Sequence, residues 1–139
     1  MLKSIRHMDY VILLCEDLTV MKDFYNKTMG FPIYLDAGTW IEMRVGSVLL
    51  TLSQRGRPFE GPPVPDESAS VQLAFRVTPQ EVYSCFHELQ EKNVEIIEPP
   101  TDKNMTYWKH RTLFFKDPEG NILEIYADIE FAEELDENE

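Results

Sequence analysis

The chain has 139 residues, of which 43% are hydrophobic and 27% are charged, and its formal net charge is −12 at pH 7. This length fits one compact domain or two small modules, and the composition excludes an intrinsically disordered chain, which would lack the apolar surface needed to offset chain entropy. The negative charge repels phosphate groups, so we expect neither nucleic acid nor an anionic membrane as a partner.

The negative charge is concentrated near the C-terminus. Residues 128–139 hold seven carboxylates and no base, so residues 1–127 carry only −5, and we interpret residues 128–139 as an acidic tail. The longest uninterrupted apolar run, residues 10–15, is far shorter than the roughly 20 residues that cross a bilayer, and shorter than the core of a secretory signal. We therefore expect a cytoplasmic protein.

The first half of the chain predicts a strand, a helix and three further strands. Residues 9–15 form an apolar strand, and one helical stripe follows at three- and four-residue spacing: Leu18, Met21, Phe24, Tyr25 and Met29. Asp17 or Thr19 is suited to cap this helix, and Gly30 to close it. Runs rich in β-branched and aromatic residues predict strands at 32–36, 39–45 and 47–53. These elements define a first module over residues 1–53.

The second half repeats this order after a linker. Residues 54–70 are rich in proline and glycine and show neither a strand nor a helix period, so they predict a linker. Residues 72–77 predict a strand, and Thr78 with Glu81 forms a capping box that opens a helix with Pro79 at its first position. Further strands are predicted at 94–98, 111–116 and 121–127. The second module therefore spans residues 71–127.

The two halves align as an internal repeat. The offset is 62 through the first strand and helix, where Tyr10 matches Gln72, and 73 in the last strand, where Thr51 matches Glu124. The second half thus has about eleven extra residues, which we assign to a loop over residues 99–110. We predict an α+β fold of two tandem βαβββ modules, whose curved mixed sheets are covered by helices on one face and enclose a cleft with the other.

The sequence resembles the vicinal oxygen chelate superfamily, which includes glyoxalase I, bleomycin-resistance proteins, fosfomycin-resistance proteins and extradiol dioxygenases. The resemblance covers residues 8–127, and its most specific parts are residues 15–18 (CEDL), 24–25 (FY), 29–31 (MGF) and 111–124 (RTLFFKDPEGNILE). It implies the fold given above, but it does not specify the reaction, because this fold carries many chemistries. It also implies a homodimer, since related two-module chains commonly pair.

Metal-dependent members of this superfamily hold one divalent ion with four residues, usually His and Glu, from the first and last strands of each module. The resemblance maps these positions onto Tyr10, Thr51, Gln72 and Glu124. Only Glu124 is a typical ligand, because Tyr10 would have to lose a proton with a reference pKa of about 10 and Thr51 is a weak neutral donor. We therefore expect neither a bound metal nor another cofactor.

Glu124 has two interpretations. It is either a carboxylate in the cleft wall that a neighbouring hydroxyl or amide satisfies, such as Tyr10 or Gln72, or the anion that receives a cationic ligand. Without a metal, a desolvated carboxylate at this position is a candidate for a raised pKa, and Glu124 is the candidate catalytic residue if a reaction occurs. Arg76 shares the strand face of Gln72 and is expected to contact the ligand or to pair internally with Glu124.

Aromatic residues complete the candidate ligand site. Trp108 lies in the predicted loop, where it either seals the edge of the domain or stacks on a flat or cationic ligand, and we favour the second interpretation. Tyr126 shares the strand face of Glu124, and Trp40 is a weaker candidate of the same kind. His110 has a reference pKa near neutrality, but beside Lys109 and Arg111 it is more typical of a surface group.

The leading hypothesis is a metal-free protein, similar to bleomycin-resistance proteins, that binds or sequesters a small aromatic or cationic molecule. Its ligand-binding residues are predicted to be Tyr10, Thr51, Gln72, Arg76, Trp108 and Tyr126, with Glu124 as the carboxylate. The alternative is a metal-dependent lyase, isomerase or dioxygenase that uses Glu124 with Gln72 and Tyr10. A third hypothesis is metal-free acid–base catalysis by Glu124.

Overall fold

The computed structural model describes residues 2–63, 65 and 70–129, so most of the predicted acidic tail, residues 130–139, lies outside the described residues. The chain forms two compact units, Met1–Pro63 and Val64–Glu139. Each unit is described by itself below. The predicted α+β fold with two βαβββ modules is confirmed.

The first unit contains one mixed sheet and one helix. Strands β1 and β4 pair in parallel, and the other neighbours pair antiparallel, in the order β1-β4-β3-β2. The elements are β1 (Tyr10–Cys15), α1 (Leu18–Asp23), a π-helical turn (Phe24–Thr28), β2 (Ile33–Asp36), β3 (Trp40–Val45) and β4 (Val48–Gln54). The predicted strands are therefore all present, with bounds shifted by one residue at most ends.

Helix α1 begins where the sequence predicts but ends at Asp23, and a π-helical turn over Phe24–Thr28 continues the segment toward the predicted end at Gly30. The backbone N–H of Val20 donates to Asp17 Oδ1 at 3.2 Å, so Asp17 rather than Thr19 is the cap. The predicted stripe is buried from Leu18 to Tyr25 and half-buried at Met29, and the last turn is π-helical, with Met29 N–H donating to Phe24 O at 2.9 Å. This wider turn carries both Phe24 and Tyr25 into the core.

The second unit repeats the same topology, with the order β5-β8-β7-β6 and a parallel pair between β5 and β8. Its elements are β5 (Gln72–Arg76), α2 (Pro79–Glu91), β6 (Ile96–Asn104), β7 (Lys109–Lys116) and β8 (Ile122–Asp128). The predicted capping box is present, because Thr78 N–H and Thr78 Oγ1 both donate to Glu81 Oε1, at 3.0 and 2.6 Å. Within the described part of the chain, neither helix is long and apolar enough to cross a membrane.

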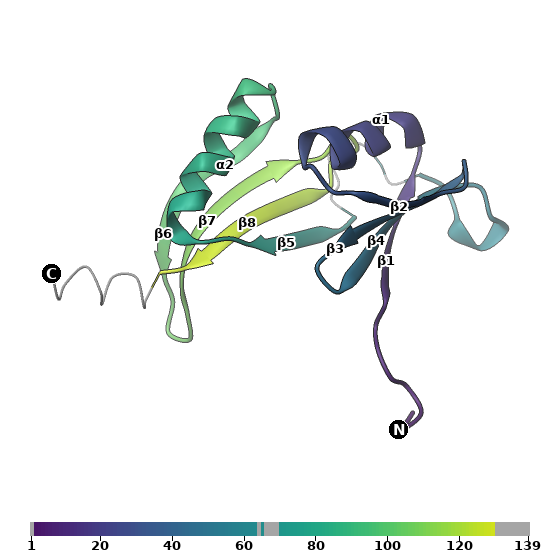
Figure 1. Ribbon diagram of the computed structural model, residues 1–139, viewed down its shortest axis with the longest axis horizontal. Helices are drawn as coiled ribbons and strands as arrows, with labels where there is room; N and C mark the ends of the chain where they lie inside the picture. Colours follow the sequence, from purple (N-terminus) through teal and green to yellow (C-terminus); the bar gives the residue numbers. More distant parts are fainter. Residues whose placement is uncertain (1, 64, 66–69, 130–139) are drawn as a thin grey trace, which may run out of the picture. The chain divides into compact units, whose positions relative to one another are not determined.

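Each helix covers one face of its own sheet (Figure 1). In the second unit, the side chains that lie under α2 are almost completely buried: Leu113, Phe115, Leu123, Ile125 and Ala127. In the first unit, the corresponding buried side chains are Leu13, Cys15, Ile41, Met43, Leu50 and Leu52. We call this side of each sheet the helix side and the opposite side the helix-free face. Because strand side chains alternate, the residues between these positions lie on the helix-free face.

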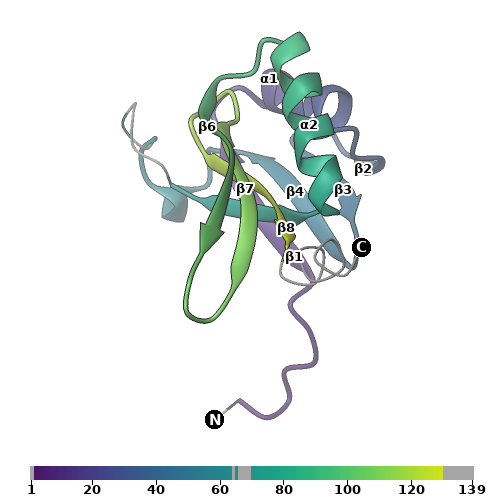
Figure 2. The same ribbon diagram turned by 90° about the vertical axis from the view of Figure 1, so that its left-hand side faces the viewer.

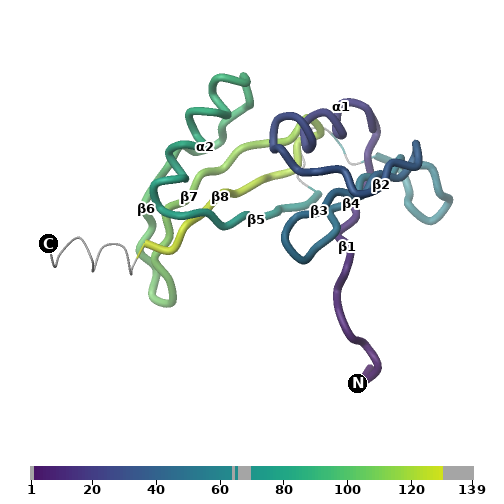
Figure 3. The backbone as a smooth tube through the Cα atoms, viewed as in Figure 1, coloured from purple at the N-terminus to yellow at the C-terminus, as the bar shows by residue number. Residues whose placement is uncertain are grey.

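The internal repeat extends to the register of the strands, and the tube in Figure 3 can be followed through the same order twice. Tyr10 pairs with Leu49 in the first unit, and Gln72 pairs with Ile122 in the second. Gln72 follows Tyr10 by 62 residues and Ile122 follows Leu49 by 73, so this pair of strands keeps both predicted offsets. The equivalence extends to the edge strands, where β2 and β6 each carry a register shift after the first pair.

The predicted loop over residues 99–110 is not a loop. Strand β6 continues to Asn104 and β7 begins at Lys109, so the extra residues extend a β-hairpin, seen as a long projecting ribbon in Figure 2. The strand pairing of Ile33 with Met43 in the first unit is equivalent to that of Ile96 with Phe115 in the second. The offset between the units rises from 63 at the first residue of the pair to 72 at the second, so nine of the extra residues lie in this hairpin. Pro99 and Pro100 are tolerated because β6 is an edge strand with register shifts around them.

One turn of 3-10 helix, Pro58–Glu60, lies in the segment predicted as a linker. Its last residue, Glu60, accepts hydrogen bonds at Oε1 from the backbone N–H groups of Gly56 and Arg57, at 2.8 and 3.0 Å. These two N–H groups, followed by the Arg57 side chain, lower the pKa of Glu60 from its ordinary value of 4.5 to about 2.

We expect a carboxyl-detected NMR titration to give a pKa of about 2 for Glu60. Because this folded pKa lies below the unfolded one, Glu60 contributes stability that is complete above pH 4.5 and is lost as the pH falls toward 2. The variant Arg57→Met is the control, and most of the depression should persist in it because backbone N–H groups are the main cause. A return to the ordinary value in this variant would assign the effect to the guanidinium instead.

Candidate functional site

The polar side chains predicted for the second half of the site lie on one surface, the helix-free face of the second unit. Gln72 and Arg76 on β5 and Glu124 and Tyr126 on β8 alternate with side chains buried under α2. Glu124 lies opposite Ala74 on one side and opposite Phe114 on the other. The predicted shared face is therefore present within this unit.

Glu124 is half-buried, and within residues 2–63, 65 and 70–129 its carboxylate has neither a hydrogen bond nor an ion pair. The predicted internal satisfaction by Tyr10 or Gln72 is not found in the described part of the chain. A partly desolvated carboxylate without a partner is costly, and a cation from a ligand removes that cost. This environment favours the interpretation of Glu124 as an anion that receives a ligand.

Arg76 contacts Tyr126 rather than Glu124. Its Nε donates to the Tyr126 hydroxyl at 3.2 Å, and its guanidinium carbon lies 5.5 Å from the centroid of the Tyr126 ring. The hydrogen bond to Tyr126, then the charges of Tyr126 and Asp128, raise the pKa of Arg76 further above its ordinary value. The alternative of an internal ion pair between Arg76 and Glu124 is therefore wrong among the described residues, and Arg76 stays cationic at one end of an aromatic row.

That row continues through His110 to Trp108. The His110 ring lies 4.7 Å from Tyr126 and 4.2 Å from Trp108, with only 16° between the planes of His110 and Trp108. We call Arg76, Tyr126, His110 and Trp108 the aromatic row. Because neighbouring rings cover each other's faces within the row, the ring edges and the end of the row at Trp108 are the parts suited to contact a flat or cationic molecule. The structure thus groups three of the predicted ligand-binding residues.

The hairpin between β6 and β7 positions Trp108. Met105 N–H donates to Trp108 O at 2.9 Å and closes the turn just before β7. Trp108 is half-buried, whereas Tyr107 at the tip is 76% exposed and packs edge-on against Trp108 at 5.8 Å. His110 is likewise half-buried, and it packs between Trp108 and Tyr126 instead of standing alone beside Lys109 and Arg111. Residue parity along β7, which places His110 with Thr112 and Phe114, is the signal that identifies its face.

In the first unit, Tyr10 and Thr51 lie on the helix-free face, as predicted, but they differ in access. Tyr10 is 44% exposed, whereas Thr51 has no exposed surface and donates its hydroxyl to Leu49 O at 3.2 Å. Thr51 therefore has no free side-chain surface with which to contact a ligand in this conformation. Tyr10 is the accessible member of the predicted pair.

The sequence analysis missed Glu42, a buried carboxylate on the same face. Glu42 lies on β3 opposite Thr51, is 6% exposed, and accepts a hydrogen bond at Oε2 from Trp40 Nε1 at 2.8 Å. The Trp40 and Tyr10 rings lie 6.3 Å apart beside it. The negative charge of Glu42, then burial, raises the pKa of Tyr10 above 10. The alternation of residues 40–45, with Ile41 and Met43 on the helix side, was the available signal.

The residues at the metal positions of the superfamily do not fit a divalent ion. Within the described residues, no three His, Cys, Asp or Glu side chains gather closely enough to share a metal. Of the four positions, Glu124 offers a carboxylate, Gln72 an amide and Thr51 a hydroxyl bonded to backbone. The raised pKa of Tyr10 makes the loss of its hydroxyl proton, which a phenolate ligand requires, less favourable still. This donor set lacks the two or three strong ligands that such ions require.

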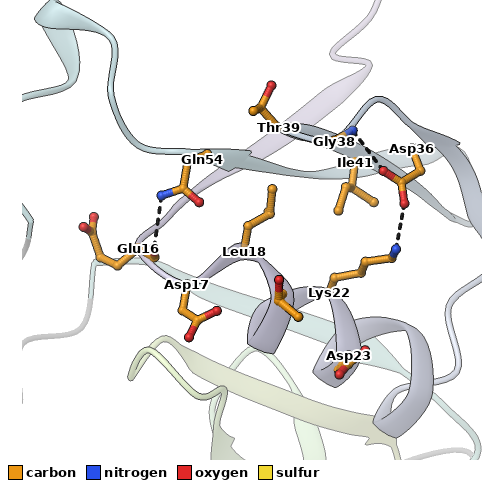
Figure 4. Close-up of a pocket in the computed structure, with 11 residues that line it drawn as sticks. Glu16, Asp17, Leu18, Lys22, Asp23, Asp36, Gly38, Thr39, Ile41 and Gln54 are labelled. Atoms are coloured by element: carbon orange, nitrogen blue, oxygen red, sulfur yellow. Dashed lines mark hydrogen bonds and ion pairs between the residues drawn. The ribbon is translucent and has the colours of Figure 1, made fainter.

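A pocket of about 560 Å³ lies elsewhere, on the helix side of the first unit at the start of α1 (Figure 4). No predicted site residue lines it. Its acidic side chains have partners within the unit, since Lys22 pairs with Asp36 at 2.7 Å and Asp17 caps α1. The pocket is therefore a surface hollow whose charges are already matched, and it gives no support to a ligand site.

The fold and the polar helix-free faces define a protein of the vicinal oxygen chelate type, and comparison with known proteins agrees. The family model described as a glyoxalase-like domain matches residues 8–130. The chain therefore belongs to the glyoxalase-like domain family, within the superfamily that the sequence motifs predicted.

The similar proteins are distant. The chain is 24% identical over 122 residues to a glyoxalase domain-containing protein of Mycosarcoma maydis, covering 88% of this chain and 68% of that protein. It is 22% identical over 121 residues to a virulence protein of Salmonella typhimurium, covering 87% and 83%.

Solved structures show the same fold. A glyoxalase/bleomycin resistance protein/dioxygenase from Nocardioides matches with a TM-score of 0.75 and 21% identity over 91% of this chain and 86% of that one. The crystal structure of the Salmonella typhimurium virulence protein matches with a TM-score of 0.69 and 22% identity over 89% and 98%. At these identities the likeness is one of fold, so the function rests on this chain's own residues.

Proposed function

We propose that this protein binds a small aromatic cation on its helix-free faces without the help of a metal ion. The observation that carries the proposal is the half-buried Glu124 carboxylate, which has no partner among the described residues and shares its face with the aromatic row. Stacking on the row supplies apolar contact, and Glu124 supplies the charge that a cation requires. The predicted homodimer and cytoplasmic location stay predictions.

The metal-dependent alternative has weaker support, because its donor set is one carboxylate and one amide with a phenol whose pKa is raised. Acid–base catalysis by Glu124 has a specific geometric requirement, a substrate proton within hydrogen-bond reach of the carboxylate. The structure gives no observation that favours it over binding. The variant Glu124→Gln tests both hypotheses. If Glu124 supplies charge, the variant weakens binding, and if Glu124 transfers a proton, the variant loses turnover.

The proposal is tested with proflavine, a planar aromatic cation, and a protein whose only tryptophan is Trp108. The chain has two tryptophans, so the variant Trp40→Phe leaves Trp108 as the sole reporter. We expect saturable quenching of Trp108 fluorescence, and about tenfold weaker binding in Glu124→Gln, because a single ion pair to a partly desolvated carboxylate is worth about 1.4 kcal/mol. The same titration with EDTA present should give an unchanged Kd.

The matched control is Glu91→Gln, which removes the same charge from an exposed position at the end of α2. It should leave the affinity for proflavine unchanged. Equal affinity in Glu124→Gln and Glu91→Gln would exclude a role for Glu124, and loss of binding with EDTA would favour the metal-dependent alternative. Near-stoichiometric divalent metal in protein purified without chelator would also favour the metal-dependent alternative.

A further inference from the structure

Glu42 is a buried carboxylate whose charge the first unit does not neutralise. The residue is 6% exposed and lies on the helix-free face, so it is not part of the apolar core under α1. Burying a carboxylate is costly unless a cation pairs with it or several donors surround it. The neutral indole N–H of Trp40 donates to Glu42 Oε2 at 2.8 Å, and the neutral hydroxyl of Tyr10 also hydrogen-bonds to the Glu42 carboxylate. Neutral hydrogen bonds from these two side chains stabilise the carboxylate but leave its full negative charge without a cation.

The cationic side chains of Arg44 and Lys22 are engaged elsewhere. Arg44 lies two residues along the same strand and face, but its guanidinium carbon sits 4.6 Å from the centroid of the Tyr34 ring. Lys22 pairs with Asp36 on the helix side. Within residues 2–63, 65 and 70–129, no Lys, Arg or His nitrogen forms an ion pair with Glu42. The site therefore has a negative charge to offer to a ligand.

Two aromatic rings stand beside this carboxylate. The Tyr10 and Trp40 rings are 6.3 Å apart with 57° between their planes, so they are tilted and do not stack on each other. Tyr10 is 44% exposed and Trp40 is half-buried, so both rings have accessible surface. The raised pKa of Tyr10 keeps its hydroxyl protonated, and the main cause is the charge of Glu42. Aromatic faces around a carboxylate are the chemistry that binds alkylated ammonium groups.

We propose that Glu42, Trp40 and Tyr10 form a subsite for a quaternary ammonium group. An alkylated ammonium suits this site better than a primary amine, because it needs no hydrogen-bond acceptor, and Glu42 Oε2 is already occupied by the Trp40 N–H. Its diffuse charge also costs less to remove from water. This inference rests on the proposed function, binding without a metal, and adds to it a second subsite and the class of cation.

The test compares choline with dimethylbutanol, its uncharged isostere in which carbon replaces nitrogen. The variant Trp108→Phe leaves Trp40 as the only tryptophan, so fluorescence reports the first unit alone. We expect a saturable change in Trp40 fluorescence with choline, and at least about tenfold weaker binding of dimethylbutanol, as a single ion pair implies. This comparison needs no change at Glu42, so it decides the question even if variants of that residue fail to fold.

The variant Glu42→Gln is expected to lose the preference for choline over dimethylbutanol, while Glu124→Gln and Glu91→Gln keep it. Circular dichroism confirms that each variant is folded. Equal binding of choline and dimethylbutanol, no binding of choline, or a preference that persists in Glu42→Gln would each overturn the proposal. Because proflavine is read at Trp108 and choline at Trp40, failure of this inference and failure of the proposed function are separate outcomes.

Discussion

The variant Phe115→Ala should lose about 4 kcal/mol of unfolding free energy, the largest effect expected for a single substitution in the second unit. Phe115 lies on the helix side of β7 and has no exposed surface. Truncation removes the transfer free energy of the ring and leaves a cavity that the rigid sheet and α2 fill only in part. Urea unfolding followed by circular dichroism measures the change.

The neighbouring Phe114 provides a matched control on the opposite face. It is half-buried, lies opposite Glu124, and has the Lys103 amine 4.7 Å from its ring centroid. We expect Phe114→Ala to cost about 1 kcal/mol, because its ring keeps water contact in the folded state. Similar losses for the two variants would contradict the assignment of a helix side and a helix-free face, and the candidate site with it.

The variant Asp117→Ala should cost about 3 kcal/mol, since it removes the acceptor of three hydrogen bonds in a buried turn. Asp117 Oδ1 accepts from the N–H groups of Glu119 and Asn121 at 2.9 and 3.0 Å, and Oδ2 accepts from Asn121 Nδ2 at 2.8 Å. Asp117 and Asn121 are 4% and 5% exposed, so water does not replace these bonds without rearrangement of the turn. The measurement is again the free energy of unfolding in urea.

The control for this turn is Pro118→Ala. Pro118 is exposed at the next position, and its replacement relaxes the turn dihedral without removing an acceptor. A loss of at most about 1 kcal/mol is expected. If Pro118→Ala costs as much as Asp117→Ala, then the stability of the turn comes from its backbone dihedrals and not from the buried carboxylate.

Alternation and capping made most of the fold predictable from the sequence. Asp17, Thr78 and Glu81 mark helix starts through short local hydrogen bonds, which sequence spacing alone specifies. Strands at 94–98 and 111–116 were predicted, but the continuation of β6 to Asn104 was not, because Pro99 and Pro100 argue locally against a strand. Their tolerance depends on β6 being an edge strand, and edge position is a property of the whole sheet.

The candidate site was predicted only in part, for the same reason. Arg76, Tyr126 and Trp108 were identified by parity and composition, but their contacts require the register between β7 and β8 and the turn that carries Trp108. Glu42 was missed because the resemblance directs attention to the first and last strands of each module, whereas Glu42 lies on β3. Its hydrogen bond from Trp40 depends on side-chain geometry that no spacing rule supplies.

The nine added residues of the second unit have an evolutionary consequence. They lengthen an edge hairpin of a duplicated unit and leave the register of the parallel strand pair unchanged. Mutation can therefore replace Trp108 at the end of this hairpin without changing that register, whereas Asp102 further along β6 pairs with Arg111, which contacts α2 at Pro79 O. The tip of the hairpin is thus a place where the ligand preference of the second unit can change while the strand register that the two units share is kept.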